Sequence, residues 1–509
     1  MKQTLIRQAT LYDGTGSMPF AADVLIEGET IQKIAKAIAP EAIDGEVEIV
    51  EAQGLALAPG FIDTHSHSDL EVLRHPQMRH VIAQGITTEI IGQDGSTVAP
   101  VHDGIVKELA DNMAPLSGVV ERPYWWRSYG QYLSEIRKAQ PCTRIEGLAG
   151  HGTIRMYVMG NDNRKPSPAE LQRMKELTAQ CMEEGARGIS FGLIYPPGSY
   201  AETEELTEIC KTVAAYDGIA MVHMRNEQDR LLQSIDEMAC VARQSGIRMH
   251  ISHLKALGMR NWGKVREALE KLEEVRSEGI DITFDQYPYA ATCTGLKVVV
   301  PPWAYEGGEQ GFQARLLNAG EYRRIAEETQ EEIAKRGGAE QIMIGTVATE
   351  ENRWMEGLRL SEIAARRGQQ PADAVLSILQ EEGPSVVAIY FSISEEDVET
   401  VMQSPLHCVC TDGIVGAHPH PRAYGAFAQV LGHYCRERGI LRLEDAIRKM
   451  TSEPARRLRL WDRGLLRQGM SADLVLFDPA TVTNINSYTE PKKSPEGFAG
   501  VWVAGRRRL

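Results

Sequence analysis

The chain has 509 residues, enough for one large domain with a smaller domain beside it. Hydrophobic residues make up 43% and charged residues 25%, so a globular core is expected. The formal net charge of -15 argues against nucleic acid or an anionic membrane as a main partner. The sequence has no run of about 18 apolar residues of the kind that spans a membrane. Its 8 cysteines form no dense framework, which predicts reduced thiols and a cytoplasmic location.

Both ends of the chain are predicted to be rich in strands. Hydrophobic and polar residues alternate over residues 22–26, and residues 472–478 and 500–505 have a similar strand-like composition. We therefore predict one small β-sandwich domain that is built from residues 1–58 and 463–509. The alternative is two unrelated β-rich flanks.

Between these flanks, residues 59–462 alternate predicted strands and helices. The expected strands are residues 87–92, 145–150, 188–193, 219–224, 248–253, 281–286 and 407–412. With one further strand ahead of His65 they number about eight, which predicts the α/β class and a (β/α)8 TIM-like barrel. Residues 386–393 are an extra strand candidate, so the count is not exact.

The alternation of strands and helices is interrupted over about residues 288–348. This stretch contains Pro301-Pro302-Trp303 and a helical pattern over residues 322–335. We interpret it as an insertion in the barrel near the active-site end. It is either a lid or a plain surface insertion.

A pair of histidines follows the first barrel strand. An apolar run over residues 55–62 leads to His65 and His67. Residues two apart on a strand point to the same side, so both imidazoles can face one point and bind a divalent transition metal, with zinc as the first choice. The pair alone is weak evidence, because two such histidines are often ordinary polar residues.

Three other predicted strand ends carry candidate metal ligands, namely His223, His253 and Asp412. Catalytic groups of such barrels lie at the carboxyl ends of the strands. Each of the three could separately be a structural histidine or a capping aspartate. Their joint occurrence with the first pair predicts a metal centre.

At this point the chain resembles the amidohydrolase superfamily, and within it the D-aminoacylases, which are N-acyl-D-amino-acid deacylases. The resemblance covers about residues 50–478. It is carried by Pro59-Gly60-Phe61-Ile62-Asp63-Thr64-His65-Ser66-His67, His223-Met224-Arg225-Asn226-Glu227, Ile251-Ser252-His253-Leu254-Lys255, Asp285-Gln286-Tyr287-Pro288-Tyr289 and His418-Pro419-His420-Pro421-Arg422. It implies a zinc-bearing barrel with a small β-sandwich and a barrel insertion, and hydrolysis of small N-acyl-D-amino acids.

The sequence departs from the family pattern at Gly92-Gln93-Asp94-Gly95, where these deacylases have a metal-bridging cysteine. Many other amidohydrolases bridge with a carboxylated lysine, and residues 188–193 contain no lysine. We therefore predict that Asp94 bridges two metal positions. A carboxylate would admit Mn2+ or Co2+ beside Zn2+ more readily than a thiolate. The alternative is that Asp94 only caps the next turn and that one ion is bound.

The predicted mechanism gives Asp412 the role of general base. Zinc lowers the pKa of a bound water towards neutrality. Asp412 would accept the proton of this water and pass it to the leaving nitrogen. By resemblance, Lys255, Tyr287 and Arg422 would bind the substrate carboxylate, since arginine binds carboxylates through two hydrogen bonds and lysine adds a point charge.

Two positions bear on substrate choice. Cys293 occupies a place where relatives have a polar serine contact. Subgroups that prefer acidic D-amino acids carry an extra arginine in the stretch over residues 296–300, which is mostly apolar here. This difference predicts a preference for neutral or hydrophobic side chains.

Other functions stay open. Gly188-Ile189-Ser190-Phe191-Gly192 matches the G-x-S-x-G nucleophile motif, although no helix is expected directly after the serine. An amidohydrolase of a cyclic amide or a dipeptide is another alternative, and a non-catalytic barrel scaffold is a third. Cys408 and Cys410 are more simply core residues than a second metal site. The oligomeric state stays unknown.

Overall fold

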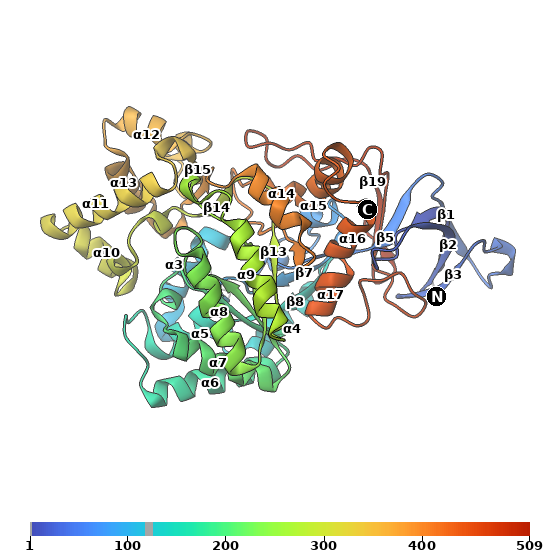
Figure 1. Ribbon diagram of the computed structural model, residues 1–509, viewed down its shortest axis with the longest axis horizontal. Coiled ribbons are helices and arrows are strands. Elements are labelled where there is room, and N and C mark those ends of the chain that lie inside the picture. Colours follow the sequence, from blue (N-terminus) through green and yellow to red (C-terminus); the bar gives the residue numbers. More distant parts are fainter. Residues whose placement is uncertain (1–2, 118–125) are drawn as a thin grey trace.

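The computed structural model describes residues 3–117 and 126–509, so the first two residues of the predicted N-terminal segment lie outside the description. Three parts follow one another along the longest axis (Figure 1). A β-rich part that holds both termini lies at one end, and an inserted lobe lies at the other. The barrel lies between them.

The barrel wall consists of parallel strands in two sheets. One sheet has the order β6 (Phe61–Asp63), β7 (Ile86–Ile91), β8 (Arg144–Gly147). The other contains β9 (Ala149–Gly150), β10 (Gly188–Gly192), β11 (Ile219–His223), β12 (Arg248–Ile251), β13 (Ile282–Gln286) and β17 (His407–Val409). The sheets join because β9 follows β8 almost directly, and a parallel bridge between Ser66 and Gly413 links the ends of β6 and β17. The strands therefore close into the predicted (β/α)8 barrel.

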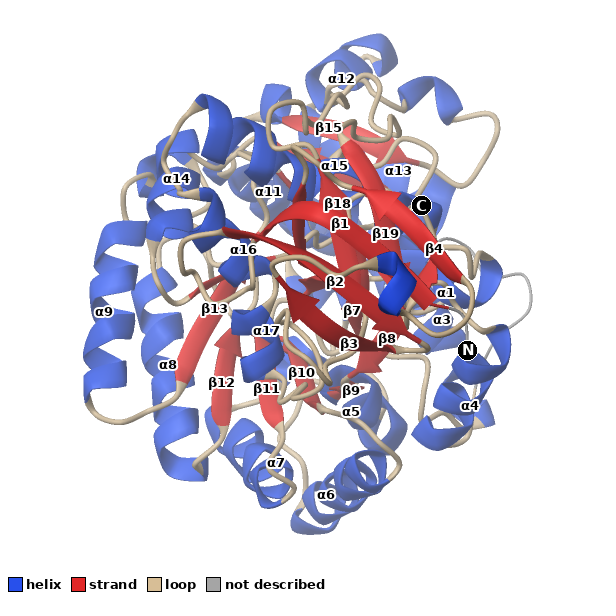
Figure 2. Cartoon of the chain, turned by 90° about the vertical axis from the view of Figure 1, so that its right-hand side faces the viewer, coloured by secondary structure: helices blue, strands red, loops and turns tan. Residues whose placement is uncertain are grey.

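Helices surround these strands, and Figure 2 shows α6–α9 outside β10–β13. The helices of the barrel are α1 (Glu71–Arg74), α2 (Arg79–Ile82), α3 (Val106–Ser117), α4 (Tyr129–Ala139), α5 (His151–Met159), α6 (Pro168–Glu183), α7 (Thr203–Ala215), α8 (Leu231–Ser245), α9 (Val265–Ser277), α14 (Glu395–Gln403), α15 (Arg422–Gln429), α16 (Leu443–Met450) and α17 (Ser452–Arg457). Helix α6 begins at a capping box, in which the Ser167 hydroxyl accepts from Glu170 N and the Glu170 carboxylate accepts from Ser167 N. Within the described residues, no helix is both long and apolar enough to cross a membrane.

The two ends of the chain form one eight-stranded sheet. Its strands are β1 (Gln3–Leu11), β2 (Phe20–Glu27), β3 (Thr30–Ala35), β4 (Val47–Glu51), β5 (Ala56–Pro59), β18 (Leu474–Phe477), β19 (Phe498–Val503) and β20 (Arg506–Arg507). Strand β5 pairs with both β1 and β18, so it joins the two ends of the chain. A bridge between Thr30 and Ser471 brings distant parts of the sheet together over a core that contains the buried Trp502. The sandwich is therefore one continuous sheet folded over its own core.

The inserted lobe contains a small antiparallel sheet and four helices. The sheet has the order β14 (Thr292–Gly295), β16 (Val387–Tyr390), β15 (Ile342–Thr346), and the helices are α10 (Gly308–Leu316), α11 (Ala319–Lys335), α12 (Leu360–Arg367) and α13 (Pro371–Glu382). The lobe extends to about residue 390, beyond the end near residue 348 that the sequence predicts. The reason is that β16 is the central strand and pairs with both neighbours. Residues 386–393 are thus not an extra barrel strand.

Candidate metal centre

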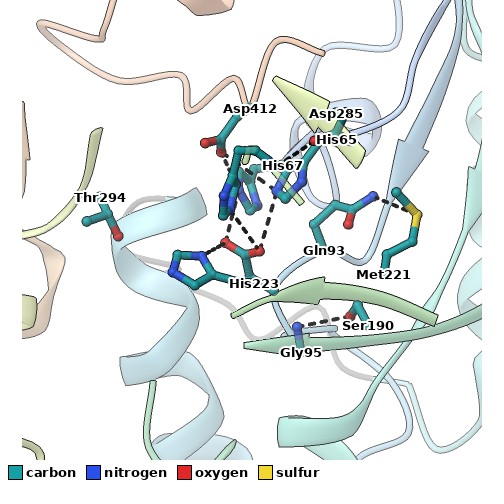
Figure 3. Close-up of polar contacts among 12 residues, drawn as sticks. His65, His67, Gln93, Gly95, Ser190, Met221, His223, Asp285, Thr294 and Asp412 are labelled. Carbon is teal, nitrogen blue, oxygen red and sulfur yellow. Dashed lines mark hydrogen bonds and ion pairs between the residues drawn. The ribbon is translucent and has the colours of Figure 1, made fainter. Parts of the chain in front are cut away.

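The predicted ligands meet at one end of the barrel. His65 and His67 follow β6, Asp94 follows β7, and His223 ends β11. His253 and Asp412 stand just beyond β12 and β17. The carboxyl ends of parallel strands share one rim of a barrel, so these side chains converge although they are far apart in sequence. Figure 3 shows His65, His67, His223 and Asp412 directed towards a common centre. All six side chains are buried.

Asp94 lies in the middle of this cluster. Its Oδ1 atom is 3.5 Å from His65 Nε2 and 3.6 Å from His253 Nε2. Its Oδ2 atom is 3.5 Å from His223 Nδ1 and 3.9 Å from His67 Nε2. Burial raises the pKa of the Asp94 carboxyl, but His65 and His223 outweigh burial and hold this pKa well below its ordinary value. An ionised carboxylate thus faces four imidazoles.

The donor atoms fit a divalent metal ion. The candidate ligand atoms of His65, Asp94 and His253 lie within 4.8 Å of one another, as do those of His65, His67 and Asp412. Among the described residues, neither ring nitrogen of His65 has a hydrogen-bond partner. A buried imidazole without a partner is costly, and a metal ion would satisfy it. Imidazole nitrogens with carboxylate oxygens suit zinc, and also manganese or cobalt.

Three of these residues have a backbone conformation that is unusual for residues other than glycine. The φ angles are 55° at Asp94, 39° at His253 and 47° at Asp412. Such left-handed geometry costs roughly 1 kcal/mol each and persists where neighbouring contacts impose it. The contacts beside these residues join Gly95 N to Ser190 Oγ (3.0 Å), His253 N to Asp285 Oδ1 (2.6 Å) and Asp412 N to His65 O (2.8 Å).

Ser190 has a structural role beside Asp94. Its hydroxyl donates to Gly92 O at 2.5 Å and accepts from Gly95 N, so it holds both sides of the Asp94 turn. Strand β10 continues into a turn after the serine, and no helix starts there. The interpretation of Gly188–Gly192 as a serine-nucleophile elbow is therefore wrong.

Arg422 lies against Asp412 inside the protein. Its Nη2 atom is 2.9 Å from Asp412 Oδ2 and donates to Cys293 O at 3.0 Å. Its guanidinium carbon lies 4.3 Å from the centre of the Tyr287 ring, within cation–π range. Burial raises the Asp412 pKa, yet the charges of Arg422 and His65 bring that pKa below its ordinary value. Within the described chain, Nε and Nη1 of Arg422 have no hydrogen-bond partner.

Lys255 is already paired, which the sequence did not indicate. Its Nζ atom donates to Glu227 Oε1 at 2.6 Å and to His253 O at 2.9 Å. Burial raises the Glu227 pKa, but Lys255 and His223 bring this pKa down to about 2. Glu227 ends the motif that begins with His223, and its position four residues after a predicted ligand was the available signal.

Asp285 is a second carboxylate whose contacts the sequence did not reveal. It accepts from Thr64 Oγ1 at 2.7 Å and from His253 N at 2.6 Å. The Asp285 Oδ2 atom is also 3.1 Å from His250 Nε2. Asp285 therefore ties the residue before His65 to the backbone of His253, and so links two predicted ligand positions.

The centre faces a small cavity under the inserted lobe. The cavity is lined by His67, Asp94, His223, His253 and Asp412 together with lobe residues such as Cys293 and Val298. It adjoins a chamber of about 1020 Å³, because Ile194, Tyr195 and Val298 line both. The chamber therefore lies beside the ligand cluster, and the cavity between them has a volume of about 30 Å³.

A closed parallel barrel with histidines and carboxylates at one rim defines the class of metal-binding (β/α)8 barrels. Within that class the chain belongs to the amidohydrolase family, whose model matches residues 48–508.

The chain is 34% identical to a D-aminoacylase of Alcaligenes xylosoxydans xylosoxydans, over 98% of this chain and 93% of that protein. It is 33% identical to the N-acyl-D-aspartate deacylase of the same organism, over 99% and 91% of the two chains.

Solved structures of deacylases are also similar to this chain. A crystal structure of D-aminoacylase matches with a TM-score of 0.84 at 32% identity, over 99% of this chain and 96% of the other. The N-acyl-D-glutamate deacylase of Bordetella bronchiseptica, complexed with zinc and a phosphonate inhibitor, matches with a TM-score of 0.85 at 30% identity, over 100% and 96%. The family resemblance and the fold class are thereby confirmed.

Proposed function

We propose that the protein is a metal-dependent N-acyl-D-amino-acid deacylase, which hydrolyses an amide bond to a carboxylate and a free D-amino acid. The observation that carries the proposal is the convergence of four histidines and two carboxylates at one rim, in a chain one third identical to a D-aminoacylase along its length. We also retain the predicted cytoplasmic location, which the eight free cysteines support.

The metal ligands in this proposal are His65, His67, Asp94, His223, His253 and Asp412. They would hold one or two divalent ions, with Asp94 between the two positions because its oxygens face separate histidines. Zinc is the favoured ion, and manganese or cobalt would also suit these donors. When bound, the ion supplies Lewis acidity that polarises the amide carbonyl and acidifies water.

Asp412 acts as the general base. Its Oδ1 atom faces His67 and its Oδ2 atom faces Arg422, so one ionised carboxylate lies beside the ligand cluster. It accepts the proton of the attacking water and passes it to the leaving nitrogen. The nitrogen needs that proton because an amide anion is too basic to depart.

Arg422, Tyr287 and Lys255 are the proposed substrate-binding residues. The support for Arg422 is that two of its nitrogens have no hydrogen-bond partner among the described residues. Arg422 is fully buried and lines neither cavity, so binding a carboxylate would require the site to open. Lys255 would have to share its ammonium between Glu227 and the substrate.

The side-chain preference that we propose is for neutral or hydrophobic D-amino acids. The cavity beside the ligands is lined by Leu116, Ile194, Val298 and Ile414, which are apolar. Arg336 also lines it, but this guanidinium is 3.2 Å from the carboxylate of Glu332. A neutral substrate side chain would pack against these four apolar residues, while Glu227 and Lys255, which also line the cavity, pair with each other.

The first experiment is hydrolysis of N-acetyl-D-methionine beside its L enantiomer by zinc-loaded protein. We expect D-selective release of methionine that a chelator abolishes and added zinc restores. Release of neither enantiomer from metal-loaded protein would reject this substrate. A panel of cyclic amides and dipeptides would then separate another amidohydrolase activity from a non-catalytic scaffold.

A further inference from the structure

A buried carboxyl group lies in the middle of a barrel strand. Glu89 belongs to β7, in which every residue is buried, and its own exposed fraction is 0%. Residues two apart on a strand share a face, so Glu89 is on the same face as Ile91. Ile91 belongs to the main apolar core, which also contains Tyr129 and Tyr132 of α4. Glu89 is therefore a polar side chain on a strand face that carries the core.

No cation balances Glu89 in the part of the chain that the structure describes. Its charged neighbours include the carboxylates of Glu71, Asp63 and Asp69, which repel it. Burial raises the pKa of the Glu89 carboxyl, although hydrogen bonds from nearby hydroxyl groups act against this shift. Burying such a group is costly unless it is hydrogen-bonded. The hydrogen bonds of Glu89 therefore decide whether the position is tolerated.

Three hydroxyl groups surround this carboxyl. Ser66 Oγ is 2.9 Å and Ser68 Oγ is 2.8 Å from Glu89 Oε1. Thr143 Oγ1 donates to Glu89 Oε2 at 2.9 Å. The two serine oxygens are also 2.8 Å apart, and each hydroxyl has one proton. One serine donates directly to Glu89 Oε1, and the other donates to the same oxygen or to the first serine. Both serines are therefore anchored at one oxygen of Glu89.

The two serines stand on either side of the proposed ligand His67. Among the described residues, no hydrogen bond of the His67 backbone is found. Ser66 N donates to Ile90 O at 3.1 Å, and Ser68 O accepts from Val72 N at 3.0 Å, so each flank has one backbone bond of its own. Glu89 joins the two flanks to each other. It therefore fixes the span of chain that carries His67.

We propose that Glu89 is a positioning residue, which holds His67 in place for the metal by binding the hydroxyl groups on both of its sides. The inference rests on the metal site in the proposed function, where His65, His67 and Asp412 could hold one ion. It extends that site by a residue on the side of the chain opposite to the ligands. Outer partners of this kind usually increase the metal affinity.

The test measures metal binding and not catalysis. Glu89→Met keeps the length of the side chain but removes both acceptor oxygens. We expect the zinc dissociation constant, from chelator competition, to rise about 10- to 100-fold. The visible spectrum of the cobalt-substituted protein should change as well, because the position of His67 changes.

Glu89→Gln separates hydrogen bonding from charge. Its amide oxygen can accept from the serines while its amide nitrogen faces Thr143, as a protonated carboxyl would. We expect the zinc dissociation constant and the cobalt spectrum of this variant to match those of the unmodified protein. A loss as large as in Glu89→Met would show that the charge is what matters, and it would reject the positioning role.

Glu382→Met is the matched control for a loss of stability. Glu382 is 6% exposed and lies in the inserted lobe, where its Oε2 atom accepts from Ala348 N at 2.7 Å and from Thr349 N at 2.8 Å. We expect a lower melting temperature with an unchanged zinc dissociation constant and cobalt spectrum. If zinc affinity falls as much as in Glu89→Met, destabilisation alone explains the effect and the proposal is overturned.

A double variant covers the case in which Glu89→Met does not fold. Ser66→Ala with Ser68→Ala removes the same hydrogen bonds and only two oxygen atoms. We expect its zinc dissociation constant to rise and its cobalt spectrum to change. Normal zinc affinity and an unchanged cobalt spectrum in this variant, or in folded Glu89→Met, would overturn the proposal. Because no substrate is used, a missing deacylase activity would not affect these results.

Discussion

The guanidinium of Arg422 lies 2.9 Å from the carboxylate of Asp412, and both side chains are buried. A buried carboxylate without a counter-charge would take up a proton. The ion pair keeps Asp412 ionised, and it also directs Oδ1 towards His67 at 3.1 Å. Arg422 thus keeps the proposed base, Asp412, ionised and fixes its orientation. Arg422 is also proposed to bind the substrate.

Replacing Asp412 with asparagine should retain the fold and remove most of kcat. The amide keeps the shape of the side chain but cannot accept the proton, so we expect a loss of about 10²- to 10⁴-fold. Steady-state kinetics measure the loss, and circular dichroism with metal analysis checks the fold and the metal content. Near-normal turnover would refute the role of Asp412 as the base.

Replacing Asp94 with alanine should lower both the metal content and the rate. Asp94 is the only carboxylate that faces all four histidines within the described residues, so its loss would remove the ligand that we propose to be common to both metal positions. Elemental analysis after dialysis gives the number of ions per chain. Asp94→Asn is the control that keeps side-chain volume and one oxygen. Unchanged metal content and rate in the alanine variant would reject the bridging role, and Asp94 would then only cap the turn that follows it.

Ser190→Ala should weaken metal binding because Ser190 holds the Asp94 turn. The variant should not lose a catalytic nucleophile, since Ser190 is not one. The change leaves Gly92 O and Gly95 N without the hydroxyl that joins them, and each unsatisfied buried group costs about 1 to 3 kcal/mol. We expect a lower melting temperature and lower zinc affinity, with activity partly restored by excess zinc. Serine-directed inhibitors should not inactivate the unmodified enzyme, and complete inactivation by them would contradict the structural role.

The stability of the protein should depend on pH through Lys449. Burial, with a smaller effect of Arg448, lowers the Lys449 pKa to about 8, while its ammonium donates to Ser404 O. A lowered lysine pKa means that the folded state disfavours the proton. Stability should therefore increase as pH rises from about 8 towards the ordinary pKa near 10.4.

The measurement compares the unmodified protein with Lys449→Met. The difference in unfolding free energy should move in favour of the unmodified protein by up to about 3 kcal/mol between pH 7 and pH 10. The contributions of other groups that titrate in this pH range cancel in the difference, because both proteins contain them. If the difference in unfolding free energy between the two proteins does not change with pH, Lys449 is not the source of the pH dependence.

The sequence predicted those parts of the molecule that depend on local pattern. His65 and His67 are recognisable because they stand two apart after an apolar strand. His223 is recognisable because it ends another strand, and Asp412 because it follows one. The barrel follows from the alternation of strands and helices. These features need only the order of elements along the chain.

Contacts between distant segments could not be predicted in this way. The pairing of Lys255 with Glu227 depends on how two neighbouring strand ends are placed in space. The end of the inserted lobe was missed because a short apolar run such as β16 looks alike in a barrel and in a separate sheet. Only the pairing of β16 with β14 and β15 shows where it belongs.

The terminal sheet has a consequence for the order of assembly during synthesis. Strand β5 pairs with β18, which is made only after the whole barrel and the inserted lobe. Such pairings have high contact order and form slowly. In a nascent chain, the β5 edge therefore stays open until the last part of the chain leaves the ribosome. Chains that stop short of β18 should expose that edge to aggregation.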